Sequence, residues 1–201
     1  MKNNGKTVAM ILGFALAAAL PLAAHSQAAA RGTYVGVGLG QAEAVNYSDR
    51  TCAVVPTANC NKKTSVYRFF GGWQFSRNWG VEFAYSDLGK ATSSTPGTFD
   101  ESVKARVGEL TVVGWWPVSD RAALYGRFGG FYGTSSVDTT NAGVEQRTTK
   151  GRANYTFAGG VQLYITDLIA VRGEGQHYVK VGTGVGDLDY TAYTLGVLFK
   201  F

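Results

Sequence analysis

The chain has 201 residues with 27 glycines, 4 prolines, 13% aromatic residues and a formal net charge of +5. A length of this order fits one domain. The 19 basic and 14 acidic residues are interspersed without a basic run, so the sequence gives no support to nucleic-acid binding.

The first thirty residues have the organisation of a secretory signal peptide. Lys2 and Lys6 precede an apolar run from Val8 to Leu20, and small residues follow. This order of basic, apolar and small residues is typical of exported proteins. The apolar run is shorter than the roughly 20 residues that span a bilayer as a helix, although a retained anchoring helix is the alternative. We predict a signal peptide over residues 1–30, cleaved after Ala28 or Ala30.

The two cysteines lie close together in a polar segment. Cys52 and Cys60 are the only cysteines of the chain. In an exported protein such a pair favours a disulfide, which by the chain-entropy estimate contributes about 2–3 kcal/mol at most for so short a loop. A redox or metal site is the alternative, but no second pair of ligands lies nearby. We therefore predict a structural bridge.

Alternating residues dominate the rest of the chain. From Ser65 to Gly89 two stretches are joined by a short turn at Ser76-Arg77-Asn78, and each has one apolar, aromatic-ended face and one small or polar face. A period of two residues predicts strands whose faces meet different surroundings. The other predicted strands are Tyr34 to Gln41, Val103 to Trp116, Ala122 to Gly133, Tyr155 to Ile165, Ile169 to Lys180 and a final strand that ends at Phe201.

The connections between these strands alternate in length. Short turns alternate with long polar segments, which we expect to be loops at Val45 to Lys63, Lys90 to Ser102, Ser135 to Arg152 and Val181 to Asp187. In an up-and-down meander this places every short turn at one end, as in outer-membrane barrels. A soluble barrel with its apolar face inward has a similar pattern.

The distribution of glycines and aromatic residues favours the membrane barrel. Glycines on the polar face suit the cramped interior of a barrel of about eight strands. The apolar face has aliphatic residues at mid-strand and aromatic residues at the ends, with all four tryptophans near the short turns, as in interfacial girdles. We predict an all-β fold, an eight-stranded antiparallel up-and-down transmembrane β-barrel over residues 31–201, in the bacterial outer membrane.

Several motifs resemble the transmembrane domain of outer membrane protein A. They are FGGWQF and WGVEFAYSDLG in the first hairpin, FAGGVQLYIT, IAVRGEGQ and the closing LGVLFKF. The resemblance covers nearly all of the predicted mature chain. It implies that an inward glutamate on the third strand, Glu82, pairs with an inward arginine on the seventh, Arg172, and closes the lumen. It also implies an inward arginine on the fifth strand at Arg127. Because the chain stops at Phe201, we expect it to lack that family's periplasmic peptidoglycan-binding domain.

The resemblance breaks down at two charged positions. The family has an inward lysine on the fourth strand and an inward glutamate on the sixth, where this chain has Val113 and Gln162. Both charges of the alternative ion pair are missing together. This leaves the interior neutral and puts a salt-bridge switching mechanism in doubt.

Alternation places six charged residues inside the predicted barrel. They are Arg68, Glu82, Glu109, Arg127, Arg172 and Glu174. Charges buried in a narrow lumen are costly unless they are paired, and three acids balance three bases. We predict that this network plugs the lumen and leaves at most a small pore.

The C-terminal residues predict an assembly signal. Phe199 and Phe201 alternate with Leu198 and Lys200, and a terminal phenylalanine of this kind resembles the signal recognised by the barrel-assembly machinery. Anchoring of the last strand in the interface is a second role, and both can hold. The expected partners are this machinery, outer-membrane lipid and lipopolysaccharide, and we expect a monomer.

The sequence leaves three functions open. The first is a non-enzymatic barrel that supports the envelope and presents loops outward, without cofactor, metal or catalytic residues. The second is a surface barrel for adhesion or host interaction, and the third is a lipid A-modifying enzyme. An enzyme needs a histidine base beside a nucleophile. His177 is the only histidine beyond the predicted signal peptide, and it has no serine two positions on.

Overall fold

The computed structural model describes residues 32–45, 59–61, 63–95, 99–141, 144–182 and 188–201. These residues form nine β-strands: β1 (Gly32–Ala44), β2 (Asn59–Asn61), β3 (Lys63–Gln74), β4 (Trp79–Thr95), β5 (Phe99–Ser119), β6 (Ala122–Asn141), β7 (Val144–Tyr164), β8 (Ile169–Val181) and β9 (Leu188–Lys200). None of the described residues belongs to a helix long and apolar enough to cross a membrane.

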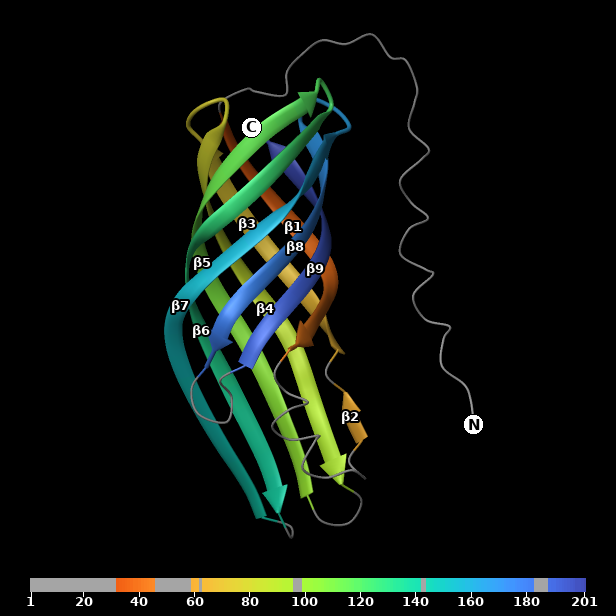
Figure 1. Cartoon of the computed structure of the whole chain (residues 1–201), viewed down its shortest axis with the longest axis vertical. Coiled ribbons are helices and arrows are strands. Elements are labelled where there is room, and N and C mark those ends of the chain that lie inside the picture. Colours follow the sequence, from red (N-terminus) through yellow and green to blue (C-terminus); the bar gives the residue numbers. More distant parts are fainter. Residues whose placement is uncertain (1–31, 46–58, 62, 96–98, 142–143, 183–187) are drawn as a thin grey trace, which may run out of the picture.

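Eight of the strands close into a barrel. The order β4-β3-β1-β9-β8-β7-β6-β5 is completed by the pairing of β4 with β5, and every pair is antiparallel. Leaving β2 aside, each strand neighbours the strands before and after it in the chain (Figure 1). The predicted fold, an eight-stranded antiparallel up-and-down barrel, is therefore confirmed.

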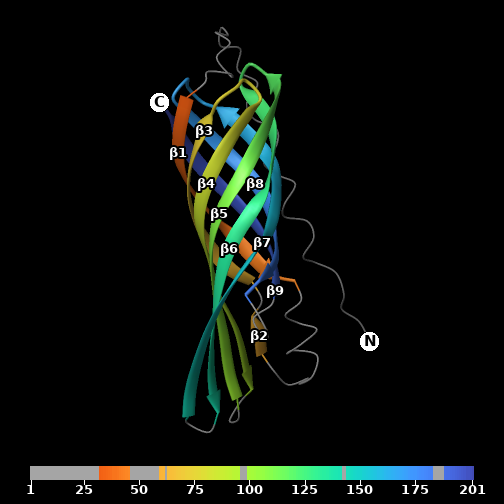
Figure 2. The same ribbon diagram turned by 90° about the vertical axis from the view of Figure 1, so that its left-hand side faces the viewer.

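The two ends of the barrel differ. Short turns close one end, where the Ser76 N–H donates to the Trp79 carbonyl at 3.2 Å and the Ile165 N–H donates to the Ile169 carbonyl at 2.9 Å. At the other end β4, β5, β6 and β7 continue well beyond the shorter strands, at the bottom of Figures 1 and 2. We call this four-stranded extension, residues 90–95, 99–106, 134–141 and 144–152, the outer sheet.

The outer sheet corrects two of the predicted loops. Most of Lys90 to Ser102 and of Ser135 to Arg152 is strand, and the pairing of β5 with β6 continues to Phe99 opposite Asn141. The sequence predicts loops there because these segments lack alternating hydrophobicity. A sheet that stands clear of the bilayer can have polar residues on both faces, so the periodic signal disappears while the Thr- and Ser-rich backbone still pairs.

The predicted loop from Val45 to Lys63 also contains a strand. In β2, Cys60 pairs with Ser93 of β4. Cys52 and the side chain of Cys60 lie outside the described residues, and so does the signal peptide of residues 1–30. The disulfide and the cleavage sites remain predictions.

The barrel wall follows the predicted alternation closely. On β3, Tyr67 and Phe69 are 55% and 59% exposed, whereas the alternate residues Arg68 and Phe70 are 3% and 6% exposed. Trp115 is an exception to the predicted girdle of four tryptophans. It points into the lumen and is 3% exposed, with its ring edge-on to Tyr34. A tight β-barrel interior accepts an aromatic side chain where neighbouring strands supply glycine, as Gly80 does against Trp115.

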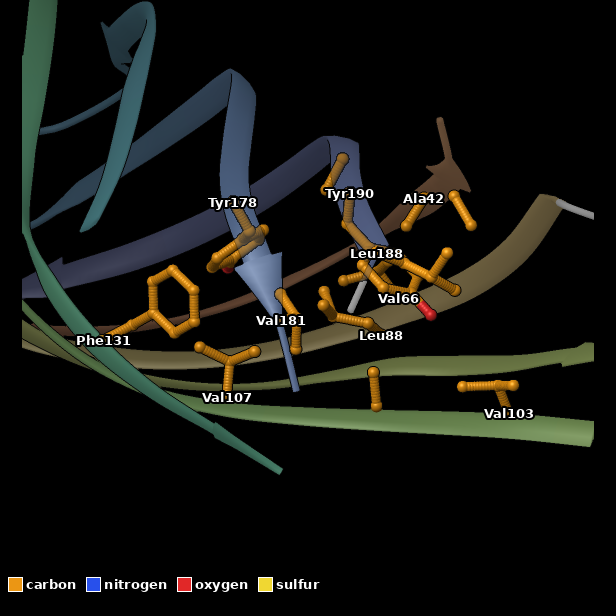
Figure 3. Packing of buried hydrophobic residues seen from close by; sticks show 13 residues of the cluster. Ala42, Val66, Leu88, Val103, Val107, Phe131, Tyr178, Val181, Leu188 and Tyr190 are labelled. Atoms are coloured by element: carbon orange, nitrogen blue, oxygen red, sulfur yellow. The ribbon is translucent and has the colours of Figure 1, made fainter. Parts of the chain in front are cut away.

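The interior contains two apolar clusters at different heights. The cluster toward the outer sheet is drawn in Figure 3, where side chains of seven barrel strands point toward one another, among them Val66, Leu88, Val107, Phe131 and Tyr178. The cluster toward the short turns includes Tyr34, Phe70, Val113, Trp115 and Tyr125. Sequence alternation predicts a small or polar inner face, so these apolar residues are a correction. The interior of an eight-stranded barrel is just wide enough for side chains to fill, and these apolar residues fill it above and below the polar ones.

Candidate functional site: the charge layer of the lumen

A layer of charged side chains separates the two apolar clusters. On β3, Arg68 stands between Val66 of one cluster and Phe70 of the other, and on β5 Glu109 lies two residues from Val107. The structure brings all six predicted residues together in this layer, each at most 7% exposed: Arg68, Glu82, Glu109, Arg127, Arg172 and Glu174. They come from β3, β4, β5, β6 and β8.

Glu82 is shared by all three arginines. Its Oε1 lies 3.1 Å from Arg68 Nη2 and 3.1 Å from Arg127 Nη1, and its Oε2 lies 2.6 Å from Arg172 Nη1. The Tyr34 hydroxyl donates to Oε2 at 2.8 Å. The pair that the family resemblance implied, Glu82 with Arg172, is therefore present, but it is part of a larger network.

The other two carboxylates hold Arg68 and Arg127. Arg127 donates from Nε and Nη2 to the two oxygens of Glu174 at 3.0 and 2.6 Å, a bidentate contact of the strong kind. Glu109 forms an ion pair with Arg68 Nη1 and accepts a hydrogen bond from Gln176 at 2.6 Å. Each of these two arginines consequently contacts all three glutamates.

Arg172 is held differently. Among the described residues its ion-pair partner is Glu82, and its Nη2 donates to Gln162 at 3.1 Å. Its guanidinium lies 4.6 Å from the centroid of the Tyr125 ring and 4.9 Å from that of Phe70. Aromatic faces attract a desolvated cation, so this arginine joins the charge layer to the apolar cluster on the short-turn side.

Uncharged polar side chains complete the layer, and the sequence analysis did not assign them to it. Gln162, at the position where the resemblance implied a glutamate, accepts from Trp115 Nε1 at 3.4 Å and from Arg172. The Tyr125 hydroxyl donates to Glu174 at 2.6 Å. Thr111 accepts from Arg127 Nη1 at 3.3 Å. Their inward position on the alternating strands was the available signal, but alternation does not show which residues of different strands meet.

The remaining predicted residues face outward. Phe199 and Phe201 are 47% and 73% exposed at the short-turn end. His177 lies on the outward side of β8, where its Nδ1 is 3.0 Å from the Thr191 hydroxyl and its ring centroid is 5.3 Å from that of Phe157. Both contacts are with neighbours across strand pairs, Thr191 on β9 and Phe157 on β7.

A profile of the family described as outer membrane protein beta-barrel domain matches residues 12–201. This chain belongs to that family. The protein is therefore a barrel of the bacterial outer membrane, and in such barrels the short turns face the periplasm and the longer connections face outward.

Relatives support the same assignment. Outer membrane protein A of Klebsiella pneumoniae is 31% identical over 138 residues, which are 66% of this chain and 40% of that protein. Outer membrane protein A of Escherichia fergusonii is 30% identical over 138 residues, 66% of this chain and 39% of the relative. The chain thus spans about two fifths of the length of these relatives.

Solved structures share the fold at low identity. The attachment invasion locus protein Ail of Yersinia pestis superposes with a TM-score of 0.56 at 13% identity, covering 85% of this chain and 99% of Ail. For OprG of Pseudomonas aeruginosa the TM-score is 0.55 at 11% identity, covering 88% of this chain and 99% of OprG.

Proposed function

We propose that this protein is a non-enzymatic barrel that supports the integrity of the outer membrane and presents the outer sheet to the exterior, with a lumen closed to solutes. The observation that carries the proposal is the stack of two apolar clusters with a neutral charge layer between them. An aqueous pore needs a continuous wetted path, and apolar constrictions resist wetting.

The charge layer supports closure through its connectivity. Three glutamates and three arginines balance, and each arginine has at least one carboxylate within 3.1 Å. A buried charge that is paired and hydrogen-bonded has little tendency to recruit water, whereas an unpaired one draws it in. The network therefore fixes the side chains across the lumen and contributes to specifying one arrangement of the strands.

Single-channel conductance in planar bilayers tests the closed lumen. The wild type is expected to conduct weakly or in rare brief openings. The double variant Arg127→Ala/Glu174→Ala, the lumen variant, removes one cation and one anion from the charge layer and should raise conductance. The matched control is Lys104→Ala with Asp87→Ala, an ion pair at 3.3 Å on the outward surface. Steady conductance of the wild type at the level of this lumen variant would contradict the proposal.

An enzymatic alternative depends on His177. Its hydroxyl partner, Thr191, lies directly opposite on β9. A hydroxyl at this distance has the reach of a nucleophile next to a base, so the alternative has a concrete residue pair. Under our proposal, His177→Ala and Thr191→Val leave the lipid A of the producing cells unchanged, as measured by mass spectrometry. A modification present with the wild type and lost with both variants would favour the enzyme.

A surface-binding role is the second candidate, and the outer sheet favours it. Between Val144 and Tyr155 the described partner of β7 is β6 alone, because the pairing with β8 begins at Thr156. Such an edge offers backbone donors and acceptors to an added strand. One structure of Ail was solved with a heparin analogue, sucrose octasulfate. Binding of the refolded protein to immobilised heparin, compared with a variant that lacks residues 138–147 at the end of the β6–β7 hairpin, tests whether this sheet binds sulfated polymers.

A further inference from the structure

The outward face of β4, β5 and β6 carries a row of charged residues directly beyond its last tyrosines. Antiparallel partners that lie opposite one another share a face. Tyr85, Gly108 and Tyr132 form one such row, and Asp87, Arg106 and Thr134 form the next toward the outer sheet. Lys90 and Lys104 form the row after that. Aromatic, charged and basic rows thus succeed one another along the same surface.

The height of these rows corresponds to the lipid headgroups. Trp116, at the periplasmic girdle, and Arg106 are ten residues apart on β5. Ten residues at about 3.3 Å each, tilted by about 40°, rise about 25 Å along the membrane normal. This equals the height of the apolar band of outer-membrane barrels, so Arg106 lies where that band ends.

A β-bulge turns the third cation outward. Asp87 pairs with Arg106 and Lys90 pairs with Lys104, so β4 uses one residue more than β5 between the two pairs. Gly89 has a φ of 78°, a left-handed conformation that glycine adopts readily. Without the extra residue, Lys90 would point to the lumen side. The bulge instead places Lys90 opposite Lys104, and redirecting a side chain in this way is a known role of β-bulges.

The charges of this cluster do not cancel. Asp87 Oδ2 lies 3.3 Å from Lys104 Nζ and 3.4 Å from Arg106 Nε. With Lys90, the cluster has three cations and one carboxylate, so its net charge is about +2. Within the described part of the chain, Lys90 has no ion-pair partner within 4.0 Å, and Lys104 and Arg106 share the single carboxylate of Asp87. The side chain of Arg106 is 53% exposed.

Below the cations, Gly108 leaves a gap in the row of outward side chains. A side chain added at Gly108 would meet nothing within 4 Å, although its neighbours on both sides are tyrosines, 46% and 60% exposed. Leu110 lies one row deeper and is 61% exposed. The Tyr132 ring leans toward Gly151, so its hydroxyl reaches the height of the charged row. This gap, the Gly108 notch, therefore faces the bilayer between two tyrosines, one of which reaches the charged row.

We propose that Lys90, Lys104 and Arg106 bind the phosphate of a phosphorylated glycolipid of the outer leaflet, of the lipopolysaccharide class, with one acyl chain in the Gly108 notch. The residual charge of the cluster matches a phosphate of charge about −1.5 to −2. Arginine and lysine donate charge-assisted hydrogen bonds to phosphate oxygens. Because all of these residues lie on the outward face, the site is independent of whether the lumen conducts.

Lipid retention by the full chain in detergent and in nanodiscs tests the site. Native mass spectrometry measures the binding of diphosphorylated lipid A and of the same lipid after dephosphorylation. Each basic residue near a membrane surface contributes about fivefold to binding of anionic lipid. The triple variant K90Q/K104Q/R106Q should therefore bind diphosphorylated lipid A about 100-fold more weakly. Dephosphorylated lipid should bind wild type and triple variant equally, and free inorganic phosphate should compete poorly.

Two further variants make the result specific. R77Q/R121Q/K180Q removes the same number of exposed cations elsewhere and should keep wild-type binding. G108L places a side chain in the notch, where an added Cβ meets nothing within 4 Å, and should weaken binding of the acylated lipid several-fold while leaving the cations in place. Folding of each variant is checked by the shift between boiled and unboiled samples on gels. Equal weakening by both triple variants, or unchanged binding by K90Q/K104Q/R106Q or by G108L, would overturn the proposal.

Discussion

The lumen and the outer rim use the same chemistry in opposite surroundings. In the lumen, Arg68 and Glu82 are 3.1 Å apart and their side chains are 3% and 0% exposed. At the rim, Lys104 and Asp87 are 3.3 Å apart and their side chains are 39% and 26% exposed. The distances are nearly equal, but water solvates the rim pair. Separation alone therefore does not determine what an ion pair contributes.

The physical reason is desolvation. Removing one partner of a buried pair leaves an uncompensated charge and typically costs about 3–5 kcal/mol. An exposed pair is screened and contributes about 0–1 kcal/mol. The lumen network should therefore govern stability, whereas the rim charges remain available to ligands. Substitutions in both regions test this contrast.

Glu82→Ala should have the largest effect. It deprives all three arginines of a carboxylate and leaves Arg172 without its ion-pair partner among the described residues. We expect a loss of about 3–5 kcal/mol in the free energy of unfolding, measured by urea titration in detergent, and less if water enters the lumen. Conductance should rise as water solvates the arginines. Asp87→Ala is the control, and a loss below about 1 kcal/mol for Glu82→Ala would refute the contrast.

The network also predicts an asymmetry within one pair. Arg172→Ala leaves Glu82 in contact with Arg68 and Arg127, so it should cost less than Glu82→Ala. The double variant should regain part of the stability lost in Glu82→Ala, because no cation is then stranded at position 172. The urea unfolding of both single variants and the double measures their coupling. Simple additivity would mean that the two side chains do not interact.

Much of this layer could be predicted from sequence, and the reason is the period of the strand. Arg68 and Glu82 lie on the small or polar face of their strands. When the sheet closes into a membrane barrel, that face lines the lumen. The resemblance to outer membrane protein A added the pairing of Glu82 with Arg172. What alternation cannot supply is the stagger between strands, which decides that Glu82 meets three arginines rather than one.

The outer sheet and the apolar clusters escaped prediction for a different reason. Phe70 and Trp115 lie on the inner face together with charged residues. A classification of each strand face as either apolar or polar therefore does not detect the apolar clusters. In β6, Ser135 faces inward and is 2% exposed, whereas Ser136 faces outward, so the same residue type occupies both faces and no periodic signal separates such a strand from a loop. The bulge at Gly89 is likewise invisible to a period of two, because one extra residue reverses the faces beyond it.

Gly72→Leu should have an intermediate effect by overfilling the lumen. A Cβ at this position would collide with the Tyr34 ring and lie 2.7 Å from the Val81 carbonyl oxygen. Displacing Tyr34 also weakens its hydrogen bond to Glu82, so we expect a loss of about 1–3 kcal/mol in urea unfolding. Gly108→Leu is the matched control, since its Cβ has open space on the outward face. Equal losses in the two variants would show that the lumen is not tightly packed there.

Deletion of Phe201 should separate assembly from stability. The side chain is 73% exposed, and the backbone N–H donates to the Thr33 carbonyl at 2.9 Å. Losing one interfacial ring and one edge hydrogen bond should cost about 1–2 kcal/mol in detergent. If the barrel-assembly machinery reads this residue, the folded amount in cells should fall much further, as seen by gel mobility of unboiled membranes. Proportionate losses in both measurements would indicate anchoring alone.

Asp87→Asn should have the smallest effect on stability and an opposite effect on lipid binding. Asparagine keeps a side-chain oxygen that can accept from the Gly89 N–H, as Asp87 Oδ1 does at 3.0 Å, so the bulge is preserved. The loss of attraction to Lys104 and Arg106 should cost about 0–1 kcal/mol in uncharged detergent and vanish in high salt. The same change raises the net charge of the cluster by one. Retention of diphosphorylated lipid A should therefore increase about fivefold in low salt. A buried acid such as Glu82 cannot behave in this way, because its removal strands cations that no ligand can reach. If Asp87→Asn lowers lipid binding instead, the carboxylate itself helps to hold the lipid, and the rim cations do not act as an independent phosphate site.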